Sequence, residues 1–484
     1  MTNETVKKRV VTDEFNQQFE LVEKLGQGGQ GVVCTTQFEG VLVKMNTQTG
    51  KDKKRKWAEH IRWLMRQPLE HLNIAKPFSR IAMNSNNVGY AMELMDGLMP
   101  LQKFMDDTEA AIETSGGSPE HYLATGGIKR RIRILAKLAR TLAGLHAKGM
   151  AYGDLSPANI FVSEQVAYSE VWLIDCDNIC INQRDSYDSL LKEGKAGKVF
   201  SPGYGAPEVV NGESFVTSLT DSWSFAVVAM KLLTTNHPFI GDLVENGTPE
   251  DQDNAFAGDL PWIYHPTDSS NAISKGLPLD LVALKPLKEL FECCFNAGKD
   301  VPSKRPSLSD WAETFEKMSN ILVNCQNNEC NASFNFVLED HKLVCPFCDS
   351  ELSNSQVLYF RHYLYDKAIL DIPDVKPTDA YIDSGYRQTL NIGETIVIKD
   401  SPPGSVYWFE STEKLSIHFN KNGLEITPMG GHTFEMGLMG SNKLQKFNST
   451  TTLALDTKKN KTLVIKPIET QLEPQIDNHF GFRW

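Results

Sequence analysis

A cluster of glycines near the N-terminus narrows the folds that this chain can adopt. Gly26, Gly28 and Gly31, with a fourth glycine at position 29, lie between two strand-like segments. Glycines at this spacing permit a tight turn whose backbone N–H groups approach phosphate oxygens with no Cβ in the way. A dinucleotide-binding loop would open a helix, whereas residues 32–33, Val-Val, continue as a strand. The segment predicts a β-hairpin that covers a nucleotide, with a glycine-rich turn without a ligand as the alternative.

A lysine follows at the end of the next apolar strand. Lys44 closes residues 41–44, Val-Leu-Val-Lys, thirteen positions after Gly31. This position suits a cation that reaches the α and β phosphates, with an exposed strand-end lysine as the alternative. A basic helix is predicted over Lys51–Arg66, and Glu59 on it is expected to hold the Lys44 ammonium as an ion-pair partner. The alternative for Glu59 is a solvated carboxylate on a helix face.

Two acidic loops form the second half of the expected site. Apolar residues recur at three- and four-residue intervals over Ile128–Leu145 and predict one long amphipathic helix. After it, Asp154 and Asn159 stand five residues apart in a loop, so the carboxylate can face a hydroxyl while the amide turns to a metal ion. Asp175 ends an apolar strand, where a Mg²⁺ ligand would be needed, and Asp177 follows it. Ordinary turn and cap aspartates are the alternative for each acid.

At these motifs the chain resembles the protein kinase superfamily over residues 18–320. The glycine hairpin, the strand lysine, the Asp154/Asn159 loop and Asp175 match the family's motifs in order. The resemblance implies an α+β, two-lobed protein-kinase-like fold that transfers the γ phosphate of ATP to serine or threonine hydroxyls of a protein substrate. Asp154 would then be the catalytic base, and Lys44 would hold the phosphates. Asn159 and Asp175 would bind Mg²⁺ or Mn²⁺.

Further segments carry the resemblance towards the C-terminus. Glu93 and Met95 lie where the family has its hinge, so their backbones would hold adenine. Residues 201–208, Ser-Pro-Gly-Tyr-Gly-Ala-Pro-Glu, resemble the end of an activation segment. Residues 221–225 resemble the helix that anchors the C-terminal lobe. Residues 304–307 resemble the segment whose arginine pairs with the glutamate of Ala-Pro-Glu.

Three departures from the family's pattern affect the expected mechanism. The family's His-Arg-Asp is Tyr-Gly-Asp at 152–154, so the arginine that couples activation-loop phosphorylation to the base is missing. Ser156 stands where serine/threonine kinases carry a lysine that contacts the γ phosphate. Asp-Phe-Gly becomes Asp-Cys-Asp at 175–177, which leaves open which acid takes the metal ion. The apolar residues before Asp175 favour that acid.

Two other functions remain open at this point. Residues 152–159 also resemble the catalytic loop of aminoglycoside phosphotransferases, which would make the chain a small-molecule kinase. Those enzymes generally lack the segments seen at 201–208, 221–225 and 304–307, so a protein substrate is favoured. The second alternative is a weakly active nucleotide-binding scaffold, which Ser156 supports and the retained acids oppose.

Four cysteines predict a metal site after the kinase-like region. Cys325, Cys330, Cys345 and Cys348 form two pairs within 24 residues. Two such knuckles place four thiolates around one tetrahedral Zn²⁺, and so small a segment cannot fold on apolar burial alone. Residues 321–352 resemble a zinc ribbon. The zinc is expected to be structural, because four thiolates leave no open position for water, and buried free cysteines are the alternative.

The last part of the chain, residues 355–484, is predicted to form an all-β, sandwich-like domain. Strand-like alternation recurs at 415–419 and 463–465, and Asn422-Gly423 suits a hairpin turn. Residues 415–434 resemble a divergent forkhead-associated domain, a phosphothreonine reader. The arginine and serine with which such a domain grips phosphate are not where its pattern needs them. A domain that docks a partner or the kinase itself is therefore favoured.

Charge and composition restrict the partners and the compartment. The chain has 49 basic and 61 acidic residues and a net charge of −12, which argues against nucleic acid or an anionic membrane as a partner. Residues 151–300 hold 9 basic and 22 acidic residues, a net of −13, which predicts protein substrates with basic segments. Within them, residues 242–258 are predicted to be a surface loop. Residues 1–14 are polar and lack the apolar run of a signal peptide, and nine cysteines, an odd and sparse number, do not suggest a disulfide framework, so a cytoplasmic protein is expected.

Overall fold

A computed structural model describes most of the chain. The described residues are 9–27, 31–84, 87–182, 200–330, 332–335, 344–352, 357–401, 411–441, 443–454, 462–468 and 476–483. Gly28 of the predicted hairpin therefore lies outside them. The chain divides into two compact units, Met1–Phe315 and Glu316–Trp484. Within the described part, no helix has the length and apolar character that crossing a membrane requires.

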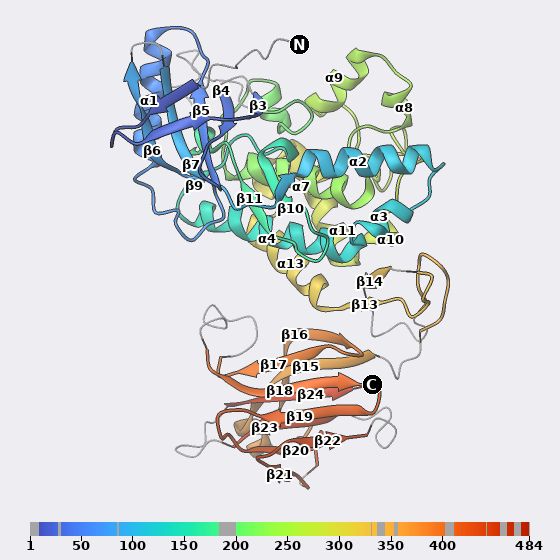
Figure 1. The fold of residues 1–484 in the computed structure, drawn as a ribbon. Coiled ribbons are helices and arrows are strands. Elements are labelled where there is room, and N and C mark those ends of the chain that lie inside the picture. Colours follow the sequence, from blue (N-terminus) through green and yellow to red (C-terminus); the bar gives the residue numbers. More distant parts are fainter. Residues whose placement is uncertain are drawn as a thin grey trace. The chain divides into compact units, whose positions relative to one another are not determined.

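The first unit begins with a small lobe built on a five-stranded antiparallel sheet, shown in blue in Figure 1. Its strand order is β3-β4-β5-β7-β6, and a separate hairpin of β1 and β2 precedes it. The elements are β1 (Arg9–Thr12), β2 (Gln18–Leu21), β3 (Lys24–Gln27), β4 (Gly31–Thr35), β5 (Val41–Asn46), α1 (Lys51–Leu64), β6 (Pro77–Asn84) and β7 (Asn87–Glu93). Helix α1 buries Trp57, Ile61 and Leu64, which lie at i, i+4 and i+7 on one face.

A larger, mainly helical lobe completes this unit. Its elements up to the short strand β12 are β8 (Leu98–Pro100), α2 (Leu101–Thr114), α3 (Glu120–Ala124), α4 (Gly127–Ala147), β9 (Met150–Ala151), η1 (Pro157–Asn159), β10 (Ile160–Ser163), β11 (Val171–Leu173), η2 (Cys176–Asn178) and β12 (Cys180–Ile181). The elements that follow are α6 (Pro207–Val210), α7 (Ser218–Thr234), α8 (Asp242–Glu245), α9 (Pro249–Ala257), α10 (Leu279–Val282), α11 (Lys285–Glu292), η3 (Cys293–Ala297), α12 (Gly298–Asp300), η4 (Pro302–Lys304) and α13 (Leu308–Asn320), whose residues from Glu316 onward belong to the second unit. Helix α4 confirms the long amphipathic helix that the apolar spacing predicts.

The segment 242–258 is not the surface loop that its composition predicts. Helices α8 and α9 occupy most of it. Thr248 and Asp251 exchange the two hydrogen bonds of a capping box at the start of α9, and Gly258 ends the helix with φ 91°. The caps at both ends stabilise α9, although the Asn, Asp and Gly content of this segment by itself favours a loop.

The second unit opens with a small cysteine-containing module. It holds a hairpin of β13 (Leu322–Asn324) and β14 (Ser333–Asn335) and a bridge between Val344 and Glu351. The module is attached to the sheet domain by hydrogen bonds. Thr389 Oγ1 donates to the Leu322 carbonyl at 2.9 Å, and Asn324 N–H donates to Asn391 Oδ1 at 2.9 Å.

Two antiparallel sheets form the rest of the second unit, shown in orange and red in Figure 1. Their strand orders are β16-β15-β24-β23-β20-β21 and β17-β18-β19-β22. The elements are β15 (Val357–Asp366), η6 (Lys367–Asp371), β16 (Tyr381–Asn391), β17 (Thr395–Lys399), β18 (Glu413–Asn420), β19 (Gly423–Pro428), β20 (Phe434–Leu438), β21 (Gln445–Phe447), β22 (Thr451–Leu453), β23 (Leu463–Pro467) and β24 (Ile476–Arg483). Phe360 and Phe480 of one sheet share a core with Ile417 of the other, so the sheets form the predicted sandwich. A hairpin turn joins β18 and β19 as expected, but one residue earlier than the sequence predicts, because Asn420 pairs with Gly423 and the turn residues are Lys421 and Asn422.

Candidate active site

The glycine-rich segment forms the predicted hairpin in its described part. Strands β3 and β4 pair antiparallel, with Gly26 opposite Val33. Gly31 opens β4 and lies close to β5, because a Cβ added there would be 2.7 Å from the Met45 carbonyl oxygen and 3.1 Å from Lys44 Cε. Glycine at position 31 therefore lets the hairpin pass directly over the lysine.

Lys44 is buried and carries two acidic partners. Its ammonium forms ion pairs with Asp175 and, at 2.8 Å, with Asp177 Oδ2. The Lys44 side chain is 2% exposed, Asp177 is 0% exposed and Asp175 is 25% exposed. Burial by itself would lower the pKa of Lys44, but the charges of Asp177 and Asp175 outweigh it and the pKa is raised. The lysine is thus held as a cation between the two acids of the Asp-Cys-Asp motif.

The structure does not bring Glu59 to this lysine. Glu59 lies on the exposed face of α1, while Trp57 of the same helix points inward. Trp57 Nε1 donates to Asp177 Oδ2 at 2.9 Å, and the Tyr90 hydroxyl donates to Asp177 Oδ1 at 2.5 Å. The two aromatic rings are stacked, with centroids 5.7 Å apart. Sequence reasoning missed both aromatic residues, although the spacing of Trp57, Ile61 and Leu64 indicates that this face of the helix is buried.

The loop that contains Asp154 is anchored by a buried acid of α7. Asp221 accepts hydrogen bonds from the backbone N–H groups of Tyr152, at 2.6 Å, and Gly153, at 2.9 Å. His146 Nε2 lies 2.9 Å from the same carboxylate. The hydroxyl of Tyr152 donates to the carbonyl of Ile174, the residue before Asp175. Burial raises the pKa of Tyr152 well above its usual value, so this hydroxyl stays protonated as a donor.

Short hydrogen bonds link the loop of Asp154 and Asn159 to the segment that ends at Asp175. Asn159 Nδ2 donates to the Asp154 carbonyl at 2.9 Å, and Ile174 N–H donates to the Asn159 carbonyl at 3.0 Å. The side chain of Asp154 accepts from Ser201 Oγ at 2.9 Å. Asp175 itself has φ 57°, in the left-handed region that asparagine and aspartate tolerate better than most residues. These contacts bring the two predicted acidic loops together.

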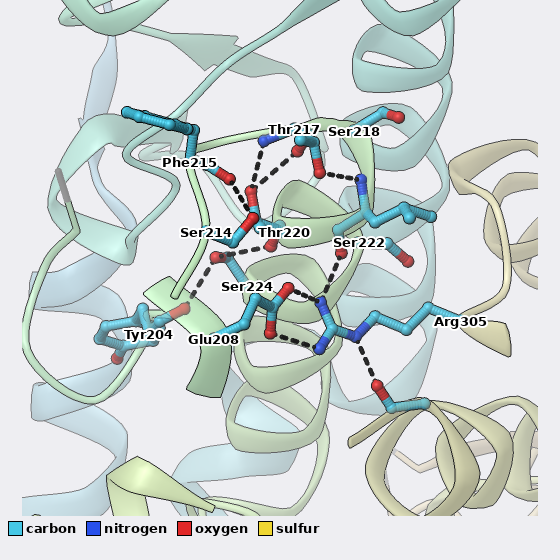
Figure 2. A network of polar contacts seen from close by, with 12 residues as sticks. Tyr204, Glu208, Ser214, Phe215, Thr217, Ser218, Thr220, Ser222, Ser224 and Arg305 are labelled. Carbon is cyan, nitrogen blue, oxygen red and sulfur yellow. Dashed lines mark hydrogen bonds and ion pairs between the residues drawn. The ribbon is translucent and has the colours of Figure 1, made fainter. Parts of the chain in front are cut away.

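The end of the expected activation segment is tied to the helical lobe by a buried ion pair, shown in Figure 2. Arg305 Nη1 and Nη2 contact the two carboxylate oxygens of Glu208 at 2.7 and 2.8 Å. Arg305 also donates to the carbonyls of Gly298 and Leu219 and lies over the ring of Trp223, 4.9 Å from its centroid. The structure confirms the pairing of these two residues that the sequence predicts.

The predicted hinge residues lie at the end of the small lobe's sheet. Glu93 is the last residue of β7, and Met95 is in the segment between β7 and β8. Both side chains are exposed, while Met92 before them is buried. The N–H of Leu94 donates to the Gly40 carbonyl at 2.9 Å. The segment is the direct chain connection between the sheet of the small lobe and the β8-β10-β11 sheet of the helical lobe.

The four predicted zinc ligands lie together. All four Sγ atoms are within 4.8 Å of one another, with Cys325 and Cys348 at 3.6 Å and Cys330 and Cys345 at 3.8 Å. Sulfurs at the corners of a tetrahedron around zinc, each about 2.3 Å from the metal, are roughly 3.8 Å apart. The cluster therefore has the donor set and the spacing of a closed zinc site.

The comparisons with known proteins agree with this geometry. A family model described as "Protein kinase domain" matches residues 19–315, more than half of the chain. This chain belongs to the protein kinase domain family. It is 31% identical over 117 residues to the serine/threonine-protein kinase pkn2 of Myxococcus xanthus, covering 24% of this chain and 14% of that protein.

Two further relatives are more distant in sequence. The chain is 27% identical over 227 residues to G protein-coupled receptor kinase 2 of Drosophila melanogaster, covering 46% of this chain and 28% of that kinase. It is 24% identical over 231 residues to the serine/threonine-protein kinase mos of Gallus gallus, covering 46% of this chain and 63% of the relative. The chain thus spans less than two thirds of the length of each of these kinases.

Proposed function

We propose that this chain is a serine/threonine protein kinase that uses ATP with Mg²⁺ or Mn²⁺, with Asp154 as the catalytic base. The contact that carries the proposal is the ion pair between Lys44 of the small lobe and Asp175 of the helical lobe. It brings the predicted phosphate-binding cation to the predicted metal ligand, next to the loop of Asp154 and Asn159. Phosphoryl transfer needs these groups on one substrate at the same time.

Asp175 and Asn159 fit a hard divalent cation. The Asp175 side chain keeps 25% of its surface exposed, and burial raises its pKa while Lys44 opposes that rise. Asn159 uses its amide nitrogen in the bond to Asp154, which leaves the amide oxygen for a cation. Carboxylate and amide oxygens are ligands that Mg²⁺ and Mn²⁺ prefer. When bound, the ion would neutralise negative charge on the phosphate oxygens.

The remaining groups would position the substrates and move one proton. Lys44 would hold the phosphates beneath the Gly26–Gly31 hairpin, and the backbones of Glu93 and Met95 would hold adenine. The substrate hydroxyl would take the place of Ser201 Oγ at Asp154, which already accepts a hydroxyl hydrogen bond. Its oxygen would bond to the γ phosphorus as the bond to the β–γ bridging oxygen breaks, and its proton would pass to Asp154.

A protein substrate is favoured over a small metabolite. Small-molecule kinases generally lack two of the segments seen here. One holds the Glu208–Arg305 ion pair, and the other holds Asp221, which anchors the catalytic loop. The acidic balance of residues 151–300 favours target segments rich in arginine and lysine.

The parts outside the kinase region would support this activity. We assign residues 321–352 as a zinc ribbon with one structural Zn²⁺ on Cys325, Cys330, Cys345 and Cys348. We assign residues 355–484 as a divergent forkhead-associated-like sandwich that docks a partner or the kinase itself. This division rests on the thiolate spacing and on the two-sheet topology.

The test is incubation of the purified chain with γ-labelled ATP and Mg²⁺, basic and acidic peptides, and phosphosite mapping. The parent chain is expected to label serine or threonine, preferentially in the basic peptides. Asp154→Ala is expected to retain nucleotide binding but to lose transfer, because it removes the proton acceptor and leaves Lys44 in place. Equal turnover in the Asp154→Ala variant and the parent would refute the assignment of Asp154 as the catalytic base. Label that reaches only a small metabolite would support the small-molecule alternative.

A further inference from the structure

The carboxylate of Asp177 is enclosed by three donors from three different elements. Lys44 of β5, Trp57 of α1 and Tyr90 of β7 contact its two oxygens at 2.8, 2.9 and 2.5 Å. Its side chain is 0% exposed. Protein donors therefore occupy both oxygens of this buried carboxylate, and its side chain has no face directed to solvent.

Asp177 is also held from its own side of the chain. It lies in the single 3₁₀ turn η2, which Ile179 N–H closes on the Cys176 carbonyl at 3.0 Å. The neighbouring Cys176 is fully buried and its Sγ contacts the Ala75 carbonyl at 3.4 Å. Because both the backbone and the carboxylate are fixed by contacts, Asp177 can hold a partner in one place.

Helix α1 cannot supply this anchor in the observed arrangement. Its inward face at this site presents the indole of Trp57, whereas Glu59 is on the exposed face. The indole N–H of Trp57 donates to Asp177, so Trp57 acts on the lysine through this acid. The ring stacking of Trp57 on Tyr90 keeps both donors oriented.

We infer that Asp177 is the positioning residue for Lys44 in this kinase, in place of a carboxylate on α1. The inference deepens the proposed function and rests on it, since Lys44 is the phosphate-binding cation of that proposal. Asp177 and Asp175 then have different roles. Asp177 keeps the ammonium in place, while Asp175, which is 25% exposed, exchanges the lysine for the metal ion when nucleotide binds.

The decisive experiment compares Asp177→Asn with Asp175→Asn in the full-length chain. Nucleotide affinity is measured with a fluorescent ATP analogue, and kcat/KM for ATP is measured at several Mg²⁺ concentrations. Asp177→Asn is expected to weaken nucleotide binding and to lower kcat/KM about 30-fold, the loss for one partner of a buried charged pair. Its half-saturating Mg²⁺ concentration stays at the parental value. Asp175→Asn is expected to raise that concentration.

Matched variants separate positioning from folding. Tyr90→Phe and Trp57→Phe each remove one donor to Asp177 and keep an aromatic ring, so each is expected to raise the KM for ATP severalfold with little change in kcat. The thermal midpoint of Asp177→Asn shows whether this variant folds. If it does not fold, Tyr90→Phe and Trp57→Phe test whether Asp177 positions Lys44. Asp52→Asn changes an exposed acid of the same helix, 89% exposed, and controls for the loss of one negative charge.

Three results would overturn the inference. The first is a parental nucleotide affinity in Asp177→Asn, as in the Asp52→Asn control. The second is a Glu59→Gln effect as large as that of Asp177→Asn, because a carboxylate of α1 would then hold the lysine. The third is a tenfold or greater rise in half-saturating Mg²⁺ for Asp177→Asn with recovery in Mn²⁺, because Asp177 would then be a metal ligand. A parent chain that binds nucleotide without transferring phosphate would refute the proposed function alone, and the binding measurements would still decide the role of Asp177.

Discussion

Replacement of Glu208 by glutamine tests how the activation segment is held to the helical lobe. Glu208→Gln keeps the size of the side chain and one acceptor oxygen but removes the negative charge that faces Arg305. The Arg305 side chain is 0% exposed and that of Glu208 is 14% exposed. The variant therefore leaves a buried guanidinium without its counterion.

The magnitude follows from the contacts. Removal of one partner from a fully buried ion pair costs about 3–5 kcal/mol. Three features reduce the cost here: Glu208 keeps some contact with water, two carbonyls still accept from Arg305, and its guanidinium lies 4.9 Å from the centroid of the Trp223 ring. We expect a loss of about 2–4 kcal/mol in the free energy of unfolding of the first unit. With an unfolding entropy of about 2.1 cal/mol/K per residue over residues 1–315, the thermal midpoint would fall by roughly 3–6 °C.

Tryptophan emission during thermal unfolding is a suitable assay, because six of the eight tryptophans lie in the first unit. The matched control is Glu170→Gln, which breaks the surface pair of Lys137 and Glu170, 44% and 42% exposed. Exposed pairs contribute about 0–1 kcal/mol, so the control midpoint should move little. Equal midpoints for the two variants would refute the view that the Glu208–Arg305 pair stabilises this lobe.

Three further predictions concern other parts of the chain. Gly31→Ala is expected to raise the KM for ATP severalfold, because its Cβ would press on the Met45 carbonyl and the Lys44 side chain, and steady-state kinetics measures this. Zinc removal by a chelator, or Cys345→Ser, is expected to unfold the cysteine module, and metal analysis should find one zinc per parent chain and less in the variant. Burial lowers the pKa of His479 from 6.5 to about 3, so between these pH values the unfolded chain binds a proton that the folded sandwich excludes. The free energy of unfolding should then fall by up to about 1.4 kcal/mol for each unit of decreasing pH. His479→Phe removes this one-proton difference, so its free energy of unfolding, measured by denaturation from pH 7 to pH 4, should depend less steeply on pH.

Much of the fold follows from local patterns. The apolar spacing over Ile128–Leu145 predicts α4 because a helix repeats every 3.6 residues and one face of this helix is buried. The alternation at 415–419 predicts β18 for the equivalent reason in a strand. Residues 242–258 show where such patterns fail, since the capping bonds of Thr248 and Asp251 outweigh a loop-like composition.

The sequence by itself determined which chemical groups the site contains: the glycine hairpin, Lys44, the Asp154/Asn159 loop and the acids at 175 and 177. Each is recognisable because its spacing and its position at a strand end or in a loop are local properties. Only the tertiary structure decided that Asp175 and Asp177, and not Glu59, meet the lysine. The rotation of α1 turns Trp57 inward and Glu59 outward, and the strands that carry Lys44 and Tyr90 converge on Asp177. Such contacts join residues up to 133 positions apart in the chain, as Lys44 and Asp177 are, so they depend on packing between elements that no local spacing encodes.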